Sequence, residues 1–209
     1  MNPPKSTPKG RQAQKAETRA LLLRVASDLF EAQGFDKTTI RDVARVAELG
    51  TGTVFVHFAG KGELLYAVLF EELERVVGEV LAADPEVELL DELRRIPAAF
   101  LNLYASRPAL YRVLLRQSLI ADGEWIARFQ GQVQRVAVRT MEALHRAQAT
   151  GEIAADLDLP TAGTAHFAFY YFTLLQAASE GFADVEGVLD RIDAMTRQQL
   201  GLGPRGAKP

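Results

Sequence analysis

Residues 39–65 read TIRDVARVAELGTGTVFVHFAGKGELL, and this stretch decides the fold of the amino-terminal part of the chain. Thr39 followed three residues later by Asp42 is typical of a capping box, and apolar residues recur at helical spacing after it. A glycine-containing turn then interrupts the pattern, and Val54 and Phe58, one turn apart, indicate a further short helix. The stretch therefore predicts two short helices joined by a tight turn, which is the arrangement of a helix-turn-helix.

Helical periodicity extends outward from this stretch in both directions. Before it, Leu22, Ala26 and Phe30 lie on one face of a helix that Gly34 ends. After it, helical spacing continues to about residue 200, and no alternating strand pattern of useful length interrupts it. The sequence predicts an all-α fold of about nine helices, three of them in the first sixty residues.

Composition and charge divide the chain into four predicted parts. Residues 1–16 are expected to form a flexible basic arm, 17–65 the helix-turn-helix domain, 66–200 a larger helical domain, and 201–209 a flexible tail. The whole chain has a formal net charge of −3, yet residues 1–65 carry ten Lys and Arg against seven Asp and Glu. A basic amino-terminal part on an acidic body suits a protein that contacts nucleic acid at one end.

The quoted residues resemble the signature of the TetR family of transcriptional regulators, T-x-R-D-I-A-x-x-A-G-V-S-x-G-T-L-Y-x-Y-F-x-x-K-E-x-L. The resemblance covers about residues 20–69. Glu48 stands where the family usually has glycine in a left-handed turn, so the turn is expected to be slightly remodelled. The resemblance implies a cytoplasmic homodimeric repressor that binds double-stranded operator DNA and releases it when residues 66–200 bind a small-molecule effector.

The resemblance also assigns DNA contacts residue by residue. Eight residues of the two short helices and of the start of the next helix are expected to contact DNA phosphates or base edges. They are Thr39, Arg41, Gly52, Thr53, Phe55, Val56, His57 and Lys61. Without the motif, Arg41 and Lys61 would be read as ordinary solvated charges and Phe55 as half core. The motif favours the DNA interpretation.

The larger domain carries aromatic residues at helical spacing, a pattern that fits either a solid core or a ligand pocket. The pocket hypothesis names a lining of Phe100, Tyr104, Tyr111, Trp125, Phe129, His166 and Tyr170. No buried cluster of Arg or Lys is evident from the pattern, so a strongly anionic ligand is disfavoured. An apolar or aromatic effector is expected.

The last two predicted helices carry more apolar surface than one protomer is expected to cover. Residues 160–181 are apolar nearly all round, and a second stripe follows from residue 185. The resemblance implies that these helices pair with those of a second protomer in a four-helix bundle. The predicted interface comprises Phe169, Phe172, Val188, Leu189 and Ile192.

The sequence gives little support to other classes of protein, such as metalloproteins, enzymes and membrane proteins. The chain has no cysteine and three histidines far apart in sequence, so neither a disulfide framework nor a metal site is expected. No catalytic motif and no phosphate-binding glycine loop occurs, so we expect no enzyme and no cofactor. Residues 159–179 lack charge, but their polar residues favour a buried helix over a membrane span. A rival of another class is a DNA-binding structural protein without a ligand, which the large apolar domain disfavours.

Overall fold

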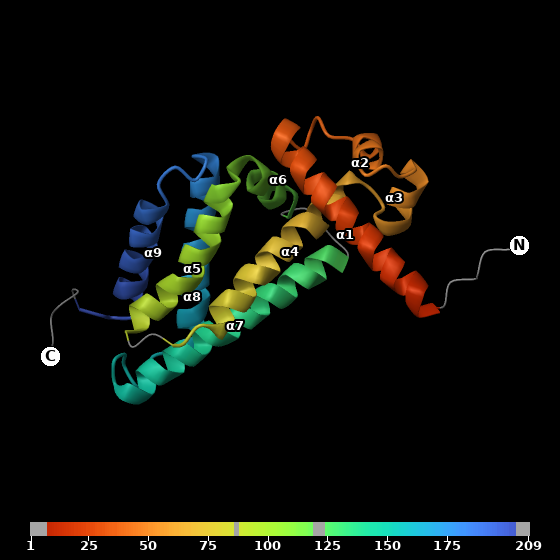
Figure 1. The fold of residues 1–209 in the computed structure, drawn as a ribbon. Coiled ribbons are helices and arrows are strands. Elements are labelled where there is room, and N and C mark those ends of the chain that lie inside the picture. The colour runs from red at the N-terminus through yellow and green to blue at the C-terminus, as the bar shows by residue number, and fades with distance from the viewer. Residues whose placement is uncertain (1–7, 86–87, 119–123, 204–209) are drawn as a thin grey trace, which may run out of the picture. The chain divides into compact units, whose positions relative to one another are not determined.

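The computed structural model describes residues 8–85, 88–118 and 124–203 of the chain, and these residues form nine α-helices and no strand (Figure 1). The predicted all-α fold with about nine helices is therefore confirmed. The helices in chain order are α1 (Pro8–Gln33), α2 (Ile40–Val46), α3 (Thr51–His57), α4 (Lys61–Ala82), α5 (Leu89–Ser106), α6 (Pro108–Ser118), α7 (Glu124–Thr150), α8 (Leu159–Ser179) and α9 (Val185–Gln199).

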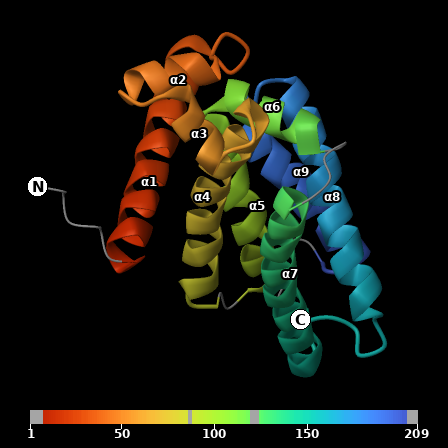
Figure 2. The same cartoon turned by 90° about the vertical axis from the view of Figure 1, so that its right-hand side faces the viewer.

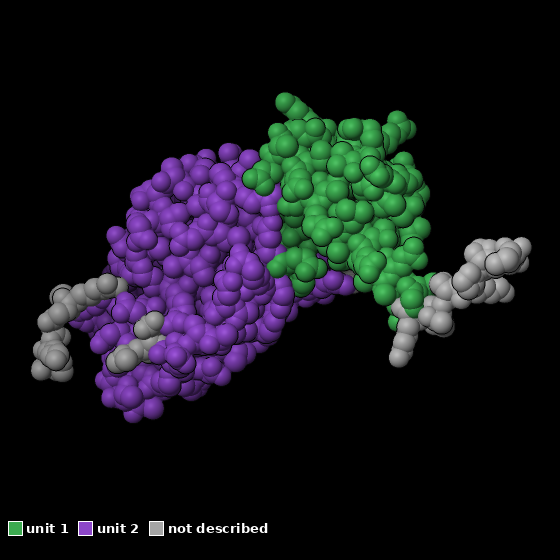
Figure 3. All heavy atoms as spheres, in the orientation of Figure 1, with its two compact units in different colours: residues 1–71 green, residues 72–209 purple. Residues whose placement is uncertain are grey.

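The chain divides into two compact units, residues 1–71 and 72–209, which are called unit 1 and unit 2 below (Figure 3). The sequence prediction placed the corresponding change at residue 66. The difference arises because α4 runs without interruption from Lys61 to Ala82, so no loop marks the boundary in the sequence.

Unit 1 is built on the helix-turn-helix. Its buried apolar residues include Leu22 and Phe30 of α1, Val43 of α2, Val54 of α3 and Phe58 beyond it. Helix α2 contacts both α1 and α3. Burying each such side chain contributes about 1.5–3 kcal/mol, and this small core fixes the direction in which α3 presents its outer face.

Part of the predicted flexible arm, residues 1–16, is helical. Helix α1 begins at Pro8, so residues 8–16, expected to be flexible, are helical, while residues 1–7 lie outside the described residues. The added segment contains Lys, Gln, Ala and Arg, which are good helix formers even without an apolar stripe. Most of the predicted carboxy-terminal tail also lies outside the described residues.

Two turns in unit 1 adopt left-handed backbone geometry. Gly34 ends α1 with φ +84°, as predicted. Glu48, between α2 and α3, has φ 56°. The turn therefore keeps the left-handed residue that a glycine would normally supply, at a cost of about 1–2 kcal/mol for a non-glycine residue.

In unit 2, α9 lies beside α8 and α5 in both views (Figures 1 and 2). The apolar stripe of α9, with Val188, Leu189 and Ile192, is buried in these contacts. The charged side of α9 is tied to α5 as well, because Arg94 Nη2 lies 2.7 Å from Glu186 Oε2 and Arg94 Nη1 lies 2.5 Å from Asp193 Oδ2.

A buried ion pair joins α5 to α7. Arg139 Nε donates to Glu92 Oε1 at 2.7 Å, and the side chains are 11% and 3% exposed. Arg139 Nη1 also donates to the carbonyl of Leu81 at the end of α4, at 3.3 Å. The guanidinium thus links three helices of unit 2 through one side chain.

Among the described helices, no single one is both long and apolar enough to cross a membrane. Only α3 and α4 taken together, bent by 57° at their junction, reach the required length and composition.

Candidate functional site

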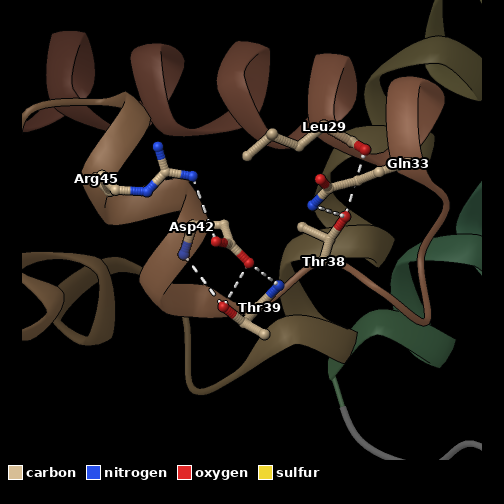
Figure 4. A network of polar contacts seen from close by, with 6 residues as sticks. All are labelled: Leu29, Gln33, Thr38, Thr39, Asp42 and Arg45. Atoms are coloured by element: carbon tan, nitrogen blue, oxygen red, sulfur yellow. Dashed lines mark hydrogen bonds and ion pairs between the residues drawn. The ribbon is translucent and has the colours of Figure 1, made fainter.

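The start of α2 is fixed by the predicted capping box (Figure 4). The Thr39 N–H donates to Asp42 Oδ2 at 3.0 Å, and the Asp42 N–H donates to Thr39 Oγ1 at 3.2 Å. The Thr39 hydroxyl also donates to Asp42 Oδ2, at 2.7 Å. These bonds from Thr39 lower the pKa of Asp42. Because both donors of Thr39 are directed at Asp42, Thr39 sets the beginning of α2 in the free protein.

The neighbouring Thr38 is a structural residue that the sequence analysis missed. It is fully buried, and its hydroxyl donates to the carbonyl of Gly34 at 2.8 Å. Gln33 Nε2 in turn donates to Thr38 Oγ1 at 3.2 Å (Figure 4). Thr38 therefore ties the end of α1 to the segment that leads into α2. The only sequence signal was that Thr38 is a threonine directly before the N-cap Thr39.

Helix α3 presents large apolar side chains to solvent. Phe55 is 54% exposed and Val56 is 69% exposed, while Val54 on the opposite face is fully buried. Gly52 and the side chain of Arg41 on α2 are exposed too, and Thr53 is half-buried. Two exposed large apolar residues on a helix of seven residues indicate a surface made to contact something other than water.

His57 ends α3 with one ring nitrogen turned inward. Its Nδ1 is buried and has no hydrogen-bond partner among the described residues. Desolvation, together with the positive charges of Lys15 and Arg19, lowers the pKa of His57, so the ring is neutral at pH 7. Only the other ring nitrogen is left for an outside partner.

Lys61, at the first position of α4, holds the loop after α1. Its Nζ donates to the carbonyl of Phe35 at 2.9 Å and to that of Asp36 at 3.3 Å, and it lies 4.3 Å from the centre of the Phe35 ring. An ammonium group has three N–H donors, so two are used within unit 1 and one remains.

Unit 2 contains a cavity of about 470 Å³. The structure places five of the predicted pocket residues in its wall: Phe100, Tyr104, Phe129, His166 and Tyr170. Val133 and Phe167 also line the cavity and are 43% and 44% exposed, so they mark where it meets solvent. None of the wall residues that the structure describes is an Asp, Glu, Lys or Arg.

Tyr111 and Trp125, predicted to line the pocket, do not belong to the cavity wall. Tyr111 is fully buried, and its hydroxyl donates to Glu72 Oε2 at 2.6 Å. Arg107 pairs with the other oxygen of the same carboxylate. Trp125 packs under the guanidinium of Arg128, which lies 4.8 Å from the ring centre. Tyr111 thus satisfies a carboxylate, while Trp125 stacks with a cation.

His166 lines the cavity, yet its hydrogen bonds are made within the protein. Its Nδ1 lies 3.0 Å from Thr196 Oγ1 of α9, and the ring is also hydrogen-bonded to the backbone of Leu93 in α5. Pro97, four residues after Leu93, has no N–H, so the Leu93 carbonyl lacks its usual helical donor. His166 therefore joins α8 to α5 and α9.

We expect the free energy of unfolding to fall by about 1.4 kcal/mol between pH 7.5 and 5.5 on account of His166. Burial lowers the pKa of His166 to about 4, below its ordinary value of 6.5. The unfolded chain therefore takes up the proton first, and the stabilisation is complete above pH 6.5 and is lost as the pH falls toward 4. Urea denaturation at fixed protomer concentration checks this, with the change taken as wild type minus His166→Gln.

The exposed His145 provides the matched control, because His145→Gln should keep the wild-type pH dependence. Equal pH dependence in His166→Gln and in the wild type would show that His166 is not buried in its neutral form.

The predicted dimer interface needs correction. Val188, Leu189 and Ile192 are at most 2% exposed, because α9 packs its apolar stripe against α5 and α8 of the same protomer. Phe172 of α8 is 60% exposed, and Phe169 is half-buried. Ala168, one turn before Phe172, is exposed as well. An exposed apolar surface therefore lies on α8, where Ala168 and Phe172 define what is called the α8 face.

The chain is similar in sequence to bacterial transcriptional regulators. The family model for bacterial regulatory proteins of the tetR family matches residues 22–68. The HTH-type transcriptional regulator TcmR of Streptomyces glaucescens is 43% identical over 63 residues, which are 29% of this chain and 28% of TcmR. The HTH-type transcriptional regulator SrpR of Pseudomonas putida is 28% identical over 151 residues, covering 71% of this chain and 70% of SrpR.

Solved structures share the fold over most of the chain. GusR of Salmonella enterica matches with a TM-score of 0.63 at 22% identity, covering 88% of this chain and 96% of GusR. FadR from Bacillus subtilis, solved in complex with stearoyl-CoA, matches with a TM-score of 0.62 at 14% identity, covering 87% of this chain and 97% of FadR.

Proposed function

Because the chain belongs to the TetR family of bacterial regulatory proteins, we propose that it represses transcription from a palindromic operator and leaves it when a small apolar molecule binds unit 2. The proposal that the chain binds DNA rests on the outer surface of α3. Phe55 and Val56 are exposed there, while Val54 on the opposite face is buried and holds the helix in place. A helix with such a surface fits the major groove, where apolar side chains contact thymine methyl groups.

The surrounding residues supply the sequence-independent contacts. Arg41 is exposed on α2 and reaches a phosphate or a base edge. Lys61 keeps one N–H for a phosphate while it holds the loop at Phe35. Thr39 contributes by positioning α2. The accessible nitrogen of His57, together with Thr53 and the exposed Gly52, completes the contact surface.

Two protomers pair through the α8 face, so that two copies of α3 enter successive major grooves. Phe172 is the anchor of this interface because a side chain of its size, 60% exposed, is unfavourable in water. Ala168 beside it lets the partner helix approach closely. A symmetric dimer of this kind accounts for a palindromic operator, since each half-site meets the same residues.

The proposal that the chain binds an effector rests on the cavity in unit 2. FadR of Bacillus subtilis was solved with stearoyl-CoA, a charged thioester, whereas the described wall of the present cavity carries no charged residue. We therefore assign a neutral, apolar or aromatic effector here. It releases DNA by binding better to a protomer arrangement that no longer fits the operator, and about 1–3 kcal/mol of coupling is sufficient. A DNA-binding protein without an effector would need no cavity of about 470 Å³.

Replacing Arg41 by alanine should weaken DNA binding by about tenfold or more, on every sequence, because the variant forfeits a charge-assisted hydrogen bond to a phosphate. The slope of log K against log salt should fall by about one for each phosphate that the variant no longer neutralises. The measurement is fluorescence anisotropy at several salt concentrations, on DNA that the wild-type protein selects from a random library. Val56→Ser should instead change which sequences are selected.

The control is Arg146→Ala, which removes an exposed arginine from α7 and should leave affinity and slope unchanged. If Arg41→Ala and Lys61→Ala combined in one chain left the affinity intact, the proposed docking would be wrong.

A further inference from the structure

Most polar groups in the wall of the cavity use their protons within the protein. The Thr140 hydroxyl donates to the carbonyl of Val136 at 3.2 Å, and the Thr164 hydroxyl donates to that of Pro160 at 2.8 Å. Gln132 Nε2 donates to Glu74 Oε2 at 3.0 Å. With His166 bound to α5 and α9, these groups have little capacity left to donate to a ligand.

Tyr104 and Tyr170 differ from these groups by having no such bond, and from the third tyrosine of the wall, Tyr171, by being buried rather than half-buried. They reach the cavity from α5 and α8, they are 7% and 9% exposed, and each hydroxyl influences the pKa of the other, as neighbouring groups do. Two hydroxyls carry two protons, and a bond between them would use only one of these. No second partner of either hydroxyl is found in the described part of the chain, so one O–H donor of the pair is left.

The pair is held in place and stays protonated. The Tyr104 ring packs against Phe100, Tyr111 and Phe182, with ring centres 6.2, 4.8 and 5.9 Å away. Burial raises the pKa of Tyr104 to about 12 and also raises that of Tyr170, so both remain donors over the physiological range.

We propose that the hydroxyl pair of Tyr104 and Tyr170 is the polar anchor of the cavity and that it selects a neutral, largely apolar effector with one hydrogen-bond acceptor, such as a ketone carbonyl. This assignment deepens the proposed function and rests on the cavity being the effector site. A carboxylate or sulfonate would enter without a cation to pair with it, and an ammonium group without an anion, and either is costly in an apolar wall.

The test uses three fluorescent probes of similar size. Prodan is a neutral naphthyl ketone whose emission shifts to the red when its carbonyl accepts a hydrogen bond. N-phenyl-1-naphthylamine is neutral and lacks a carbonyl, and 8-anilino-1-naphthalenesulfonate is the same aryl amine with a sulfonate. We expect the two neutral probes to bind the wild-type protein and to displace each other, and the sulfonate to bind that site at least tenfold more weakly.

The anchor is tested with Tyr104→Phe and Tyr170→Phe. Each variant should weaken prodan binding by about three- to tenfold and shift its bound emission to the blue, because a neutral hydrogen bond is removed. Binding of N-phenyl-1-naphthylamine should stay within about twofold, which separates a missing hydrogen bond from a damaged cavity. Tyr66→Phe, a tyrosine of α4 outside the cavity wall, should behave as the wild type.

Gly163→Leu verifies the location of the probes. A Cβ at Gly163 would lie 2.8 Å from Met141 Sδ, so a leucine there forces Met141, which also lines the cavity, to shift, and this change of the wall should weaken both neutral probes. Unchanged prodan affinity and emission in both tyrosine variants would overturn the anchor, as would equal affinity of the cavity for the sulfonate. Operator release is scored separately, so a prodan-bound protein that keeps its DNA would refute the effector role and leave the anchor standing.

Discussion

Replacing Phe172 by glutamate should separate the homodimer and lower operator affinity by about 100-fold or more. The reason is that Phe172 is 60% exposed in the protomer and is proposed to be buried at the partner's α8 face, where an unpaired carboxylate is strongly unfavourable. A monomer retains one α3 and therefore one half-site. Analytical ultracentrifugation and anisotropy on the selected DNA measure the two effects.

Val138→Glu is the matched control, because Val138 on α7 is an apolar residue with a similar exposure of 49%. It should leave both the dimer and the DNA affinity unchanged. Leu189→Glu, in contrast, should destabilise the protomer itself, since Leu189 is 1% exposed within it. A Phe172→Glu protein that remains dimeric and binds DNA normally would exclude the α8 face as the interface.

The second large effect is expected at the buried ion pair of unit 2. Arg139→Met should lower the free energy of unfolding by about 3–5 kcal/mol, because it leaves the carboxylate of Glu92 buried without its main partner. That carboxylate is 3% exposed, and Arg95 Nε, 3.6 Å away, is a poor replacement. The loss is a large share of the stability of an ordinary domain. Urea denaturation at fixed protomer concentration gives the value.

A double substitution distinguishes the effect of the broken ion pair from that of poorer packing. Combining Arg139→Met with Glu92→Leu should recover most of the stability, since an apolar pair is often as stable as a buried ion pair. Arg75→Met breaks the pair between Arg75 and Glu79, whose side chains are both 61% exposed, and should cost less than about 1 kcal/mol. Similar losses in Arg75→Met and Arg139→Met would contradict the burial of the Glu92 pair.

The helix-turn-helix could be predicted closely because its signals are local. The capping box of Thr39 and Asp42 and the glycine cap at Gly34 depend on residues a few positions apart, and each is present as predicted. The turn at Glu48 was predicted less well, because we expected a remodelled turn and the backbone keeps its left-handed geometry. The residue in the turn is unfavourable there, so the flanking helices impose the geometry.

The sequence did not reveal which surface each apolar stripe packs against. The stripe of Val188, Leu189 and Ile192 shows that α9 buries one face, but nothing in it distinguishes the same protomer from a second one. Arg94 on α5 binds acidic residues of α9 and so helps to hold α9 against its own protomer. This pairing could not be predicted because it connects segments far apart in sequence.

The lining of the cavity could likewise be predicted only in part, because it depends on contacts between distant residues. Aromatic spacing identified residues on the inner faces of the helices, and five of the seven predicted residues line the cavity. Tyr111 could not be separated from them, because its position depends on the carboxylate of Glu72 from another helix. An aromatic residue at helical spacing indicates burial, whereas its partner decides whether it faces a space or fills one.

The interaction of His166 with the backbone of Leu93 couples two distant positions of the chain, 97 and 166. Proline at position 97 weakens α5 taken alone, and alanine there would restore the N–H that the Leu93 carbonyl lacks. That N–H would then compete with His166 for the carbonyl and leave a buried imidazole with one partner fewer. The two positions are therefore coupled: a residue on α5 that cannot donate an N–H leaves an acceptor for a side chain of α8.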